Sequence, residues 1–384
     1  MESSEPAWSV SETDVMRAVA EIVRDGREAV LATVVDVEGN AYRRPGAKML
    51  VTPDGSGVGS ITAGCLEDEV VELARRVLED GESRIETYDL MEDDDVWGLG
   101  VGCNGIIDVL LEPLDDGFRP VVDAFEDGDD VASLTVLESD HDDVSRFDRG
   151  YYDPTDGVVS TDDGFEWLEK SDVDVVDELV ERGRGGTIPV SADDRSIELF
   201  VDGIAAPPEL VVLGTGHDVA PIVELAAKND FRVRVIGFRG ADAVADRFPD
   251  AAAVSSTSPS TLREAHDFDE NTYVVVMTHN FLDDRLAIDE LLRTPVPYVG
   301  LMGPRERFEE MLEEFADEDR SFDDGELDRR VYTPVGLDLG GGSPYQIAHS
   351  IVAELLAVHN DRTPRHLSER EGPIHRRISS ITDD

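Results

Sequence analysis

The sequence is poor in cysteine, in lysine and in long apolar runs. Of its 384 residues, only two are cysteine and three are lysine. Two cysteines cannot build a disulfide framework, and no apolar run reaches the roughly 18 residues that a membrane span needs. The first ten residues lack a basic region followed by an apolar one, so no secretory signal is expected. We therefore expect a cytoplasmic protein in a reducing compartment, without a membrane partner.

Basic charge is scarce as well. Asp and Glu number 86 against 34 Lys and Arg, which gives a formal net charge of −52. Such a chain repels itself in dilute buffer, whereas molar salt shortens the Debye length to about 3 Å. The composition is typical of a halophilic protein whose acids form a solvated surface. A nucleic-acid partner is not expected, because no basic face is left to meet phosphates.

The order of the predicted elements indicates an α/β chain with two domains. Residues 1–205 form a mixed α/β domain whose pattern weakens after about residue 115 into an acidic middle segment. That segment predicts one helix and one strand over 115–147, an unassigned acidic stretch, and a closing strand at 196–204. Residues 206–362 alternate strands with helices, which predicts a Rossmann-like, doubly wound parallel sheet. Residues 363–384 form a charged tail.

A glycine turn opens the second domain. Gly214 and Gly216 lie between its first predicted strand and helix, where a pyrophosphate can rest on a helix N-terminus. The third glycine of the dinucleotide pattern is missing. Gly237 stands where an acid would hold a ribose, and Arg239 follows it. The turn predicts either a nucleotide such as NAD(P) or a fold that keeps the turn without the ligand.

Three further candidates follow strands of the same domain. His217 and His279 each come directly after a predicted strand, and Arg305 follows a later one. Ligands of parallel sheets bind at the carboxyl ends of the strands, so these side chains are candidate binding residues. An isolated histidine is more often structural. Zinc is not favoured, because the chain has neither an HxxxH nor a CxxC spacing.

A small basic cluster stands out in so acidic a chain. Arg43, Arg44 and Lys48 occur within the stretch "YRRPGAK". Forked arginines and a lysine point charge are suited to hold a phosphate, which predicts an anion site. The alternative is that these residues are ordinary ion-pair partners of the surrounding acids.

Both cysteines lie in glycine-rich loops. Cys65 follows Gly64 at a predicted helix start, and Cys103 lies in the loop "WGLGVGCNG". A helix N-terminus favours thiolate, and glycine lets a ligand approach the backbone. Thiolate is also a soft metal ligand, so the two loops predict a site to which both contribute. The alternative for each cysteine is a small buried hydrophobe.

Several of these stretches together resemble one family. "RRPGAKMLV…GVGSITAGCLEDEV" is similar to its N-terminal signature, which has a Gly-Cys-aliphatic-Glu core, and "WGLGVGCNGIIDVLLEPL" is similar to its second cysteine loop. "LVVLGTGHDVAPIVELA", "MTHN", "YVGLMGPRER" and "PVGLDLGGGSPYQIAHSIVAELLAV" follow in the expected order. The chain thus resembles the XdhC/CoxI family of maturation factors for molybdenum hydroxylases of the xanthine dehydrogenase and CO dehydrogenase type.

The resemblance implies a function. It implies a chaperone that binds molybdenum cofactor (molybdopterin) and delivers it, sulfurated, to an apo molybdenum hydroxylase without turning over a substrate. Cys65 would contact the molybdenum of the cofactor, and Cys103 would share that contact or shape its loop. Arg43, Arg44 and Lys48 would hold the pterin's phosphate. The resemblance also suggests a homodimer and a cysteine desulfurase as a second partner.

The chain departs from the family pattern at three places. It reads "GNAYR" where the family commonly has "GSSPR", Ala63 replaces a glycine before Cys65, and Gly237 replaces the acid that would hold a ribose. Two alternatives therefore stay open. One is an NAD(P)-dependent oxidoreductase that uses the Rossmann crevice, with His217 or His279 as acid or base. The other is a redox or scaffold subunit of the hydroxylase complex.

Overall fold

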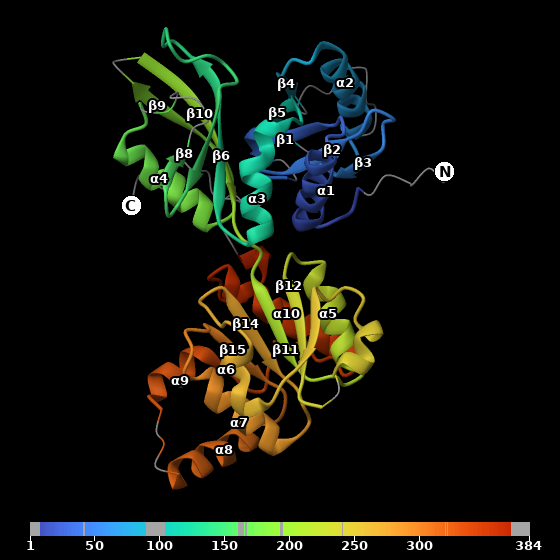
Figure 1. Cartoon of the computed structure of the whole chain (residues 1–384), viewed down its shortest axis with the longest axis vertical. Helices are drawn as coiled ribbons and strands as arrows, with labels where there is room; N and C mark the ends of the chain where they lie inside the picture. The colour runs from blue at the N-terminus through green and yellow to red at the C-terminus, as the bar shows by residue number, and fades with distance from the viewer. Residues whose placement is uncertain are drawn as a thin grey trace. The chain divides into compact units, whose positions relative to one another are not determined.

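The structure is a computed structural model of the chain. It describes residues 8–40, 43–89, 104–159, 165, 167–192, 195–239, 241–318, 320 and 322–369. The chain forms two compact units, whose boundary in the sequence lies between Ala206 and Pro207 (Figure 1). Unit 1 precedes this boundary and contains two five-stranded sheets, and unit 2 follows it and contains one six-stranded sheet. Within the described ranges, no helix combines the length and the apolar character needed to cross a membrane.

Sheet A of unit 1 has the order β3-β2-β1-β5-β4. Its strands are β1 (Val30–Asn40), β2 (Lys48–Val51), β3 (Gly57–Gly59), β4 (Arg84–Asp89) and β5 (Asn104–Pro113). Every neighbouring pair is antiparallel, so β1, β3 and β4 run in the same direction. These three strands run toward one end of the sheet, where β2 and β5 begin, and the register sets the end of β3 level with Ala32 of β1 and the end of β4 level with Glu38. We refer to this end as the carboxyl edge of sheet A.

The two faces of sheet A are covered differently. Helix α2 (Glu67–Asp80) packs on one face, and we call the buried residues there the α2 cluster. It consists of Val30, Ala32, Val34, Ala47, Met49, Val51, Ile61, Leu66, Val70, Val71, Leu73, Ala74, Val77, Tyr88, Ile107, Val109 and Leu111. The opposite face packs on α1 (Glu12–Asp25), on α3 (Arg119–Asp127) and on the second sheet. Because side chains alternate along a strand, Met49 and Leu50 face opposite sides.

Sheet B of unit 1 is antiparallel, with the order β8-β7-β6-β10-β9. Its strands are β6 (Val131–Ser139), β7 (Arg149–Asp153), β8 (Gly157–Val159), β9 (Gly185–Ala192) and β10 (Arg195–Ile204), and α4 (Lys170–Glu181) packs against it. The predicted helix, strand and closing strand are confirmed as α3, β6 and β10. The remaining elements were missed, because β7 and β8 are short and are separated by acidic turns that hide the alternation.

Unit 2 is the doubly wound parallel sheet that the alternation predicted. Its strands are β11 (Glu209–Leu213), β12 (Arg232–Gly237), β13 (Ala253–Ser256), β14 (Thr272–Val276), β15 (Tyr298–Leu301) and β16 (Val331–Tyr332). The order is β13-β12-β11-β14-β15-β16, with all neighbours parallel. The order reverses between β11 and β14, which is where such sheets bind ligands at the carboxyl ends of the strands.

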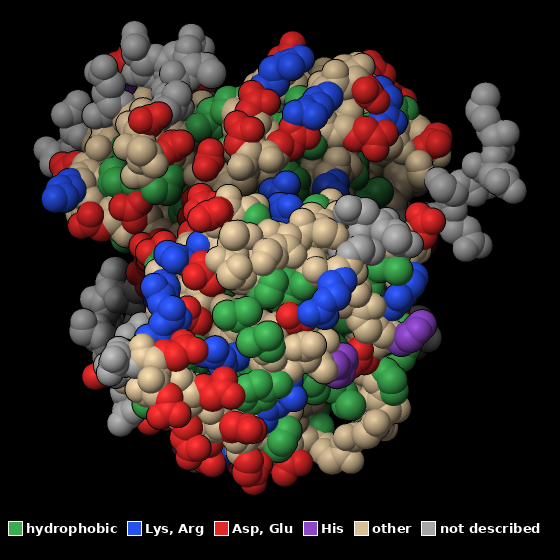
Figure 2. Space-filling view, turned by 60° about the horizontal axis from the view of Figure 1, so that its bottom comes forward, with side chains coloured by type: hydrophobic (Ala, Val, Ile, Leu, Met, Phe, Trp, Pro, Cys, Tyr) green, Lys and Arg blue, Asp and Glu red, His purple; other side chains and the backbone are tan. Residues whose placement is uncertain are grey.

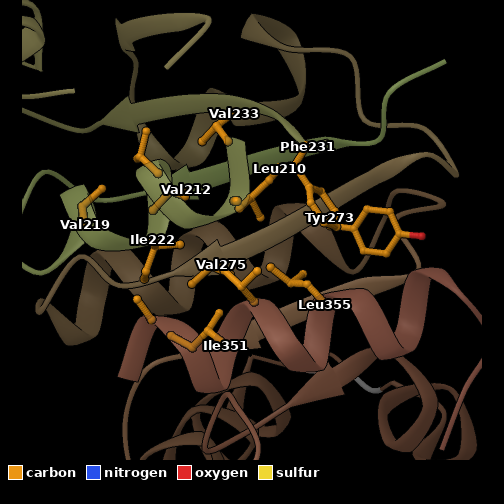
Figure 3. Close-up of a cluster of buried hydrophobic side chains, with 14 of the residues drawn as sticks. Leu210, Val212, Val219, Ile222, Phe231, Val233, Tyr273, Val275, Ile351 and Leu355 are labelled. Carbon is orange, nitrogen blue, oxygen red and sulfur yellow. The ribbon is translucent and has the colours of Figure 1, made fainter. Parts of the chain in front are cut away.

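Helices cover both faces of this sheet. One face packs on α5 (Val219–Ala227) and α10 (Pro344–His359), and Figure 3 shows Val212 and Val275 of the strands meeting Ile222 and Ile351 of these helices. The other face carries α6 (Leu262–Ala265), α7 (Phe281–Leu291), α8 (Arg305–Asp317) and α9 (Asp324–Arg330). Because both faces are covered, the central strands are apolar throughout, as the sequence pattern indicated.

Candidate functional site

Cys65 lies in the loop that joins β3 to α2, at the carboxyl edge of sheet A. The side chain is half-buried and packs against the α2 cluster. Its neighbour Gly64 is exposed, with a φ of +106°, and a Cβ at this position would meet no atom within 4 Å. The glycine is therefore required by the backbone conformation and not by crowding. An exposed, uncrowded backbone position therefore precedes the cysteine.

A buried network holds this loop in place. The Glu67 carboxylate, only 5% exposed, accepts hydrogen bonds from the Thr62 amide at 2.9 Å, the Thr62 hydroxyl at 2.7 Å and the Leu66 amide at 3.1 Å. The Thr62 hydroxyl oxygen in turn accepts from the Cys65 amide at 3.1 Å. These bonds satisfy donors at the start of α2 and fix the backbone of the cysteine. The sequence analysis included Glu67 in the Gly-Cys-aliphatic-Glu core without giving it a role, and it did not single out Thr62. The available signal was the pattern itself: a hydroxyl residue before the cysteine and an acid after it, at a helix start, are suited to hydrogen-bond the free backbone amides there.

The first turn of α2 is acidic. Glu67, Asp68 and Glu69 all occupy it. Their charges favour the helix by compensating its dipole, and they also oppose a negative charge on the sulfur of Cys65. The helix start is therefore a weaker stabiliser of thiolate than its position alone predicts.

The three predicted basic residues do not form one cluster. Lys48, which is 6% exposed, donates from Nζ to Asp202 Oδ1 of sheet B at 2.7 Å and to the Gly46 carbonyl at 2.9 Å. Since it precedes Met49 of the α2 cluster in the same strand, it faces the side of sheet A opposite to α2. Arg43 pairs with Glu12 of α1. Lys48 and Arg43 therefore form the ion pairs of the alternative interpretation, and their binding of a phosphate stays a prediction.

Arg44 differs from its two neighbours. Its side chain is exposed and forms no ion pair with any described residue. The anion-binding role stays a prediction for Arg44. Cys103 lies outside the described residues, so its role in the site also stays a prediction. The strand that follows it, β5, begins at Asn104 and pairs there with Asn40 at the end of β1.

In unit 2, the glycine turn after β11 is closed by the protein's own atoms. Gly214 has a φ of +147°, and a Cβ there would lie 2.5 Å from the Met277 carbonyl oxygen. A Cβ on Gly216 would lie closer still to Asp218 Oδ1. Nη2 of Arg247 donates at 2.9 Å to the carbonyl oxygens of both Thr215 and Gly216. Close packing against backbone thus requires the glycine at 214, whereas at 216 the nearest atom belongs to the Asp218 side chain.

His279 lies beside this turn in a strained conformation. Its Nε2 is 3.0 Å from Asp218 Oδ2, and its φ is +59°, in the left-handed region. The residues on either side are anchored: Thr278 donates to Asp284 Oδ1 at 2.5 Å, and the Asn280 side chain caps α7. Such a conformation persists only where its surroundings enforce it. The structure therefore brings together Gly214, Gly216 and His279 among the predicted residues.

The remaining candidates of unit 2 stand apart from this arrangement. His217 and Arg305 are exposed, and neither side chain pairs with a described residue. Arg239 pairs with Asp283 Oδ2 at 2.8 Å. Figure 2 turns the lower end of Figure 1 forward and shows hydrophobic and uncharged surface there, with basic and histidine side chains among it. No group of three or more His, Cys, Asp or Glu that could hold a metal ion occurs in the described part of the chain.

The fold and the two turns define an α/β protein that couples a cysteine-bearing loop domain to a Rossmann-type domain. Residues 22–89 match the model of the XdhC and CoxI family, and residues 210–355 match that of the XdhC Rossmann domain. A Bacillus subtilis (strain 168) protein, named as a probable subunit of xanthine dehydrogenase, is 30% identical over 342 residues, which cover 87% of this chain and 94% of that protein. The chain belongs to the XdhC and CoxI family.

Two further relatives agree with this assignment. The molybdenum cofactor insertion chaperone PaoD of Escherichia coli (strain K12) is 31% identical over 100 residues, which cover 26% of this chain and 31% of PaoD. A crystal structure of a xanthine dehydrogenase from Bacillus halodurans superposes with a TM-score of 0.71 at 28% identity, covering 92% of this chain and 97% of that one. The predicted family and the predicted fold class are confirmed. Cys65 lies in the first matched segment, and Cys103 lies in neither.

Proposed function

We propose that this chain is a chaperone that binds molybdenum cofactor at the carboxyl edge of sheet A and delivers it to an apo molybdenum hydroxylase. The name of one relative is that of a molybdenum cofactor insertion chaperone, and that of another is a probable xanthine dehydrogenase subunit. The observation that carries the proposal is the Cys65 loop. It presents a half-buried thiol beside an exposed glycine, on a backbone that Thr62 and Glu67 hold in place.

The residues at this edge fit the chemistry of the cargo. The cofactor presents a soft metal centre, a pterin and a phosphate, and a cysteine sulfur is a soft ligand. Gly64 leaves room for the cargo next to Cys65. Arg44 is the exposed guanidinium available for the phosphate, because Arg43 is paired with Glu12 and Lys48 with Asp202. The ion pair of Lys48 with Asp202 connects the two sheets of unit 1.

The finer steps belong to the same proposal. The cofactor is bound in its sulfurated form, a cysteine desulfurase supplies the sulfur, and Cys103 shares the contact with the metal. The chain acts in the cytoplasm as a homodimer and catalyses no turnover of its own. The formal net charge of −52 favours molar salt as its working medium, because screening there reduces self-repulsion.

The test is to purify the chain in molar KCl from cells that make the cofactor and to measure bound molybdopterin per chain. The wild type is expected to retain pterin, and the Cys65→Ala variant is expected to lose at least about nine-tenths of it. Cys103→Ala serves as the matched cysteine control and reports whether the second cysteine contributes. A wild type without pterin, or a Cys65→Ala variant that carries as much as the wild type, contradicts the proposal.

A second candidate function rests on His279. We propose as the alternative that the turn of unit 2 binds NAD(P) for an oxidoreductase or redox subunit, with His279 or His217 as acid or base. The strained backbone of His279 beside the turn supports it, and Gly237 in place of the ribose-binding acid opposes it. Calorimetry with NADH and NADPH in molar KCl tests this alternative, and the absence of binding to either nucleotide contradicts it.

A further inference from the structure

A buried hydroxyl in unit 1 has no partner among the described residues. Tyr88, near the end of β4, belongs to the α2 cluster and is 7% exposed. Its hydroxyl forms no hydrogen bond with any residue that the structure describes. A buried polar group without a partner costs about 1–3 kcal/mol, so most such groups in folded proteins have a partner. The Tyr88 hydroxyl is therefore a candidate for a hydrogen bond to a bound molecule.

The topology of unit 1 brings this hydroxyl to the Cys65 end of α2. Strands β3 and β4 are parallel, and α2 connects them across one face of sheet A. Cys65 follows the end of β3, which is level with Ala32 of β1, and Tyr88 near the end of β4 is level with Val37. The loop from β3 to α2 leads back over this face, and both Cys65 and Tyr88 pack with the α2 cluster. Burial raises the pKa of Tyr88, and the charge of Glu69 raises it further. Because Glu69 occupies the first turn of α2, about one turn past Cys65, the hydroxyl lies near the N-terminal end of that helix.

The surroundings restrict what the hydroxyl can bind. Its raised pKa keeps it protonated through the physiological range, so it is available as a donor. Glu69 and Glu86 are the charges that act on it, and both are negative. A phosphate would be repelled there, whereas a neutral acceptor would not. The carbonyl oxygen and ring nitrogens of a pterin are neutral acceptors of this kind.

We propose that the Tyr88 hydroxyl is a binding residue of the Cys65 site, donating a hydrogen bond to a neutral acceptor atom of the pterin ring system. This inference rests on the cofactor chaperone proposed above. It places the pterin ring on the α2 side of sheet A, and it leaves the phosphate to Arg44, which is exposed and outside the α2 cluster.

The test compares Tyr88→Phe with the wild type and with Tyr273→Phe. Tyr273 is a matched control in unit 2, because it is also buried and its hydroxyl lies 3.2 Å from His359 Nδ1. Thermal unfolding of each apo protein and binding of isolated molybdenum cofactor are measured anaerobically in molar KCl. Apo Tyr88→Phe is expected to unfold at the wild-type temperature or above, whereas Tyr273→Phe unfolds below it. Tyr88→Phe is expected to weaken cofactor binding about 3- to 10-fold, and Tyr273→Phe is expected to leave it unchanged.

The outcomes separate this inference from the proposed function. Unchanged cofactor affinity in Tyr88→Phe, alongside weakened affinity in Cys65→Ser, overturns the role of Tyr88 and leaves the chaperone standing. A fall in the apo unfolding temperature of Tyr88→Phe, without a change in affinity, shows that the hydroxyl has a structural partner and also overturns it. A wild type that does not bind the cofactor overturns the proposed function and this inference together.

Discussion

The Cys65 loop of unit 1 and the glycine turn of unit 2 use glycine for opposite reasons. Gly64 has open space where a Cβ would be, whereas Gly214 and Gly216 have protein atoms within 2.5 Å of that position. In unit 1, the Tyr88 hydroxyl and the Arg44 guanidinium have no partner among the described residues. Around the turn of unit 2, Asp218, His279 and Arg247 bond to one another or to the turn. The same residue type is thus required by backbone conformation in one turn and by close packing in the other.

Removal of the buried ion pair between Lys48 and Asp202 should cause the greatest loss of stability. Lys48→Met should destabilise unit 1 by about 3–5 kcal/mol, because Asp202 would remain buried and charged without its partner. The control is Lys228→Met, whose pair with Glu224 lies on the exposed surface and should change stability little. Hydrogen exchange under urea, followed separately in each unit, measures both. A Lys48→Met variant that is as stable as the wild type but does not bind the cofactor would contradict the structural role and support a role of Lys48 in binding the anion.

The two glycines offer the most direct structural contrast. Gly64→Ala should cost about 1–2 kcal/mol from backbone strain alone. Gly214→Ala should cost roughly twice as much, because its Cβ would also approach the Met277 carbonyl oxygen to 2.5 Å. The same hydrogen-exchange measurement, read in the unit that carries each substitution, gives the two values. Equal costs would mean that the turn can accommodate a Cβ at Gly214 despite the nearby Met277 carbonyl oxygen.

The network beneath Cys65 should matter to both stability and binding. Glu67→Gln replaces an acceptor with an amide donor that faces the Thr62 or Leu66 N–H, which should cost about 1–3 kcal/mol. The loosened loop should also lower cofactor occupancy. Asp68→Asn, on the exposed side of the same turn, is the matched control; it should lower stability by less than about 1 kcal/mol, through the lost interaction with the helix dipole, and leave occupancy unchanged. Full occupancy in Glu67→Gln would show that the cargo does not depend on a preorganised loop.

The smallest expected effect is a pH dependence confined to unit 2. Burial raises the pKa of Glu209, but His266 and Arg234 outweigh it and hold the pKa below 4.5. The folded state therefore binds this proton less tightly than the unfolded chain. The stability that the Glu209 carboxylate contributes is fully present above about pH 4.5, its ordinary pKa, and is lost as the pH falls through its lower folded-state pKa. Glu209→Gln should make the stability of unit 2 fall less steeply as the pH is lowered. An unchanged pH dependence would mean that other carboxylates cause the loss of stability in acid.

The architecture of unit 2 was predictable because parallel strands covered on both faces produce continuous apolar runs, such as 210–213 and 273–276. Sheet B was only partly predictable, since β7 and β8 are short and flanked by acidic turns. The role of Lys48 was not predictable from its neighbours along the chain. Strand alternation turns it away from Cys65, and its partner Asp202 lies 154 residues away. The same holds for Tyr88, whose burial depends on how α2 crosses the sheet.

We propose that the loop of unit 1 holds the cargo and that the turn of unit 2 does not. Isolated molybdenum cofactor can be titrated into the wild type, Cys65→Ala and His279→Asn under anaerobic molar KCl to distinguish the two. Cys65→Ala is expected to weaken binding at least about tenfold, while His279→Asn, which removes the contact with Asp218, is expected to bind like the wild type. Binding that depends on His279 and is indifferent to Cys65 would contradict it.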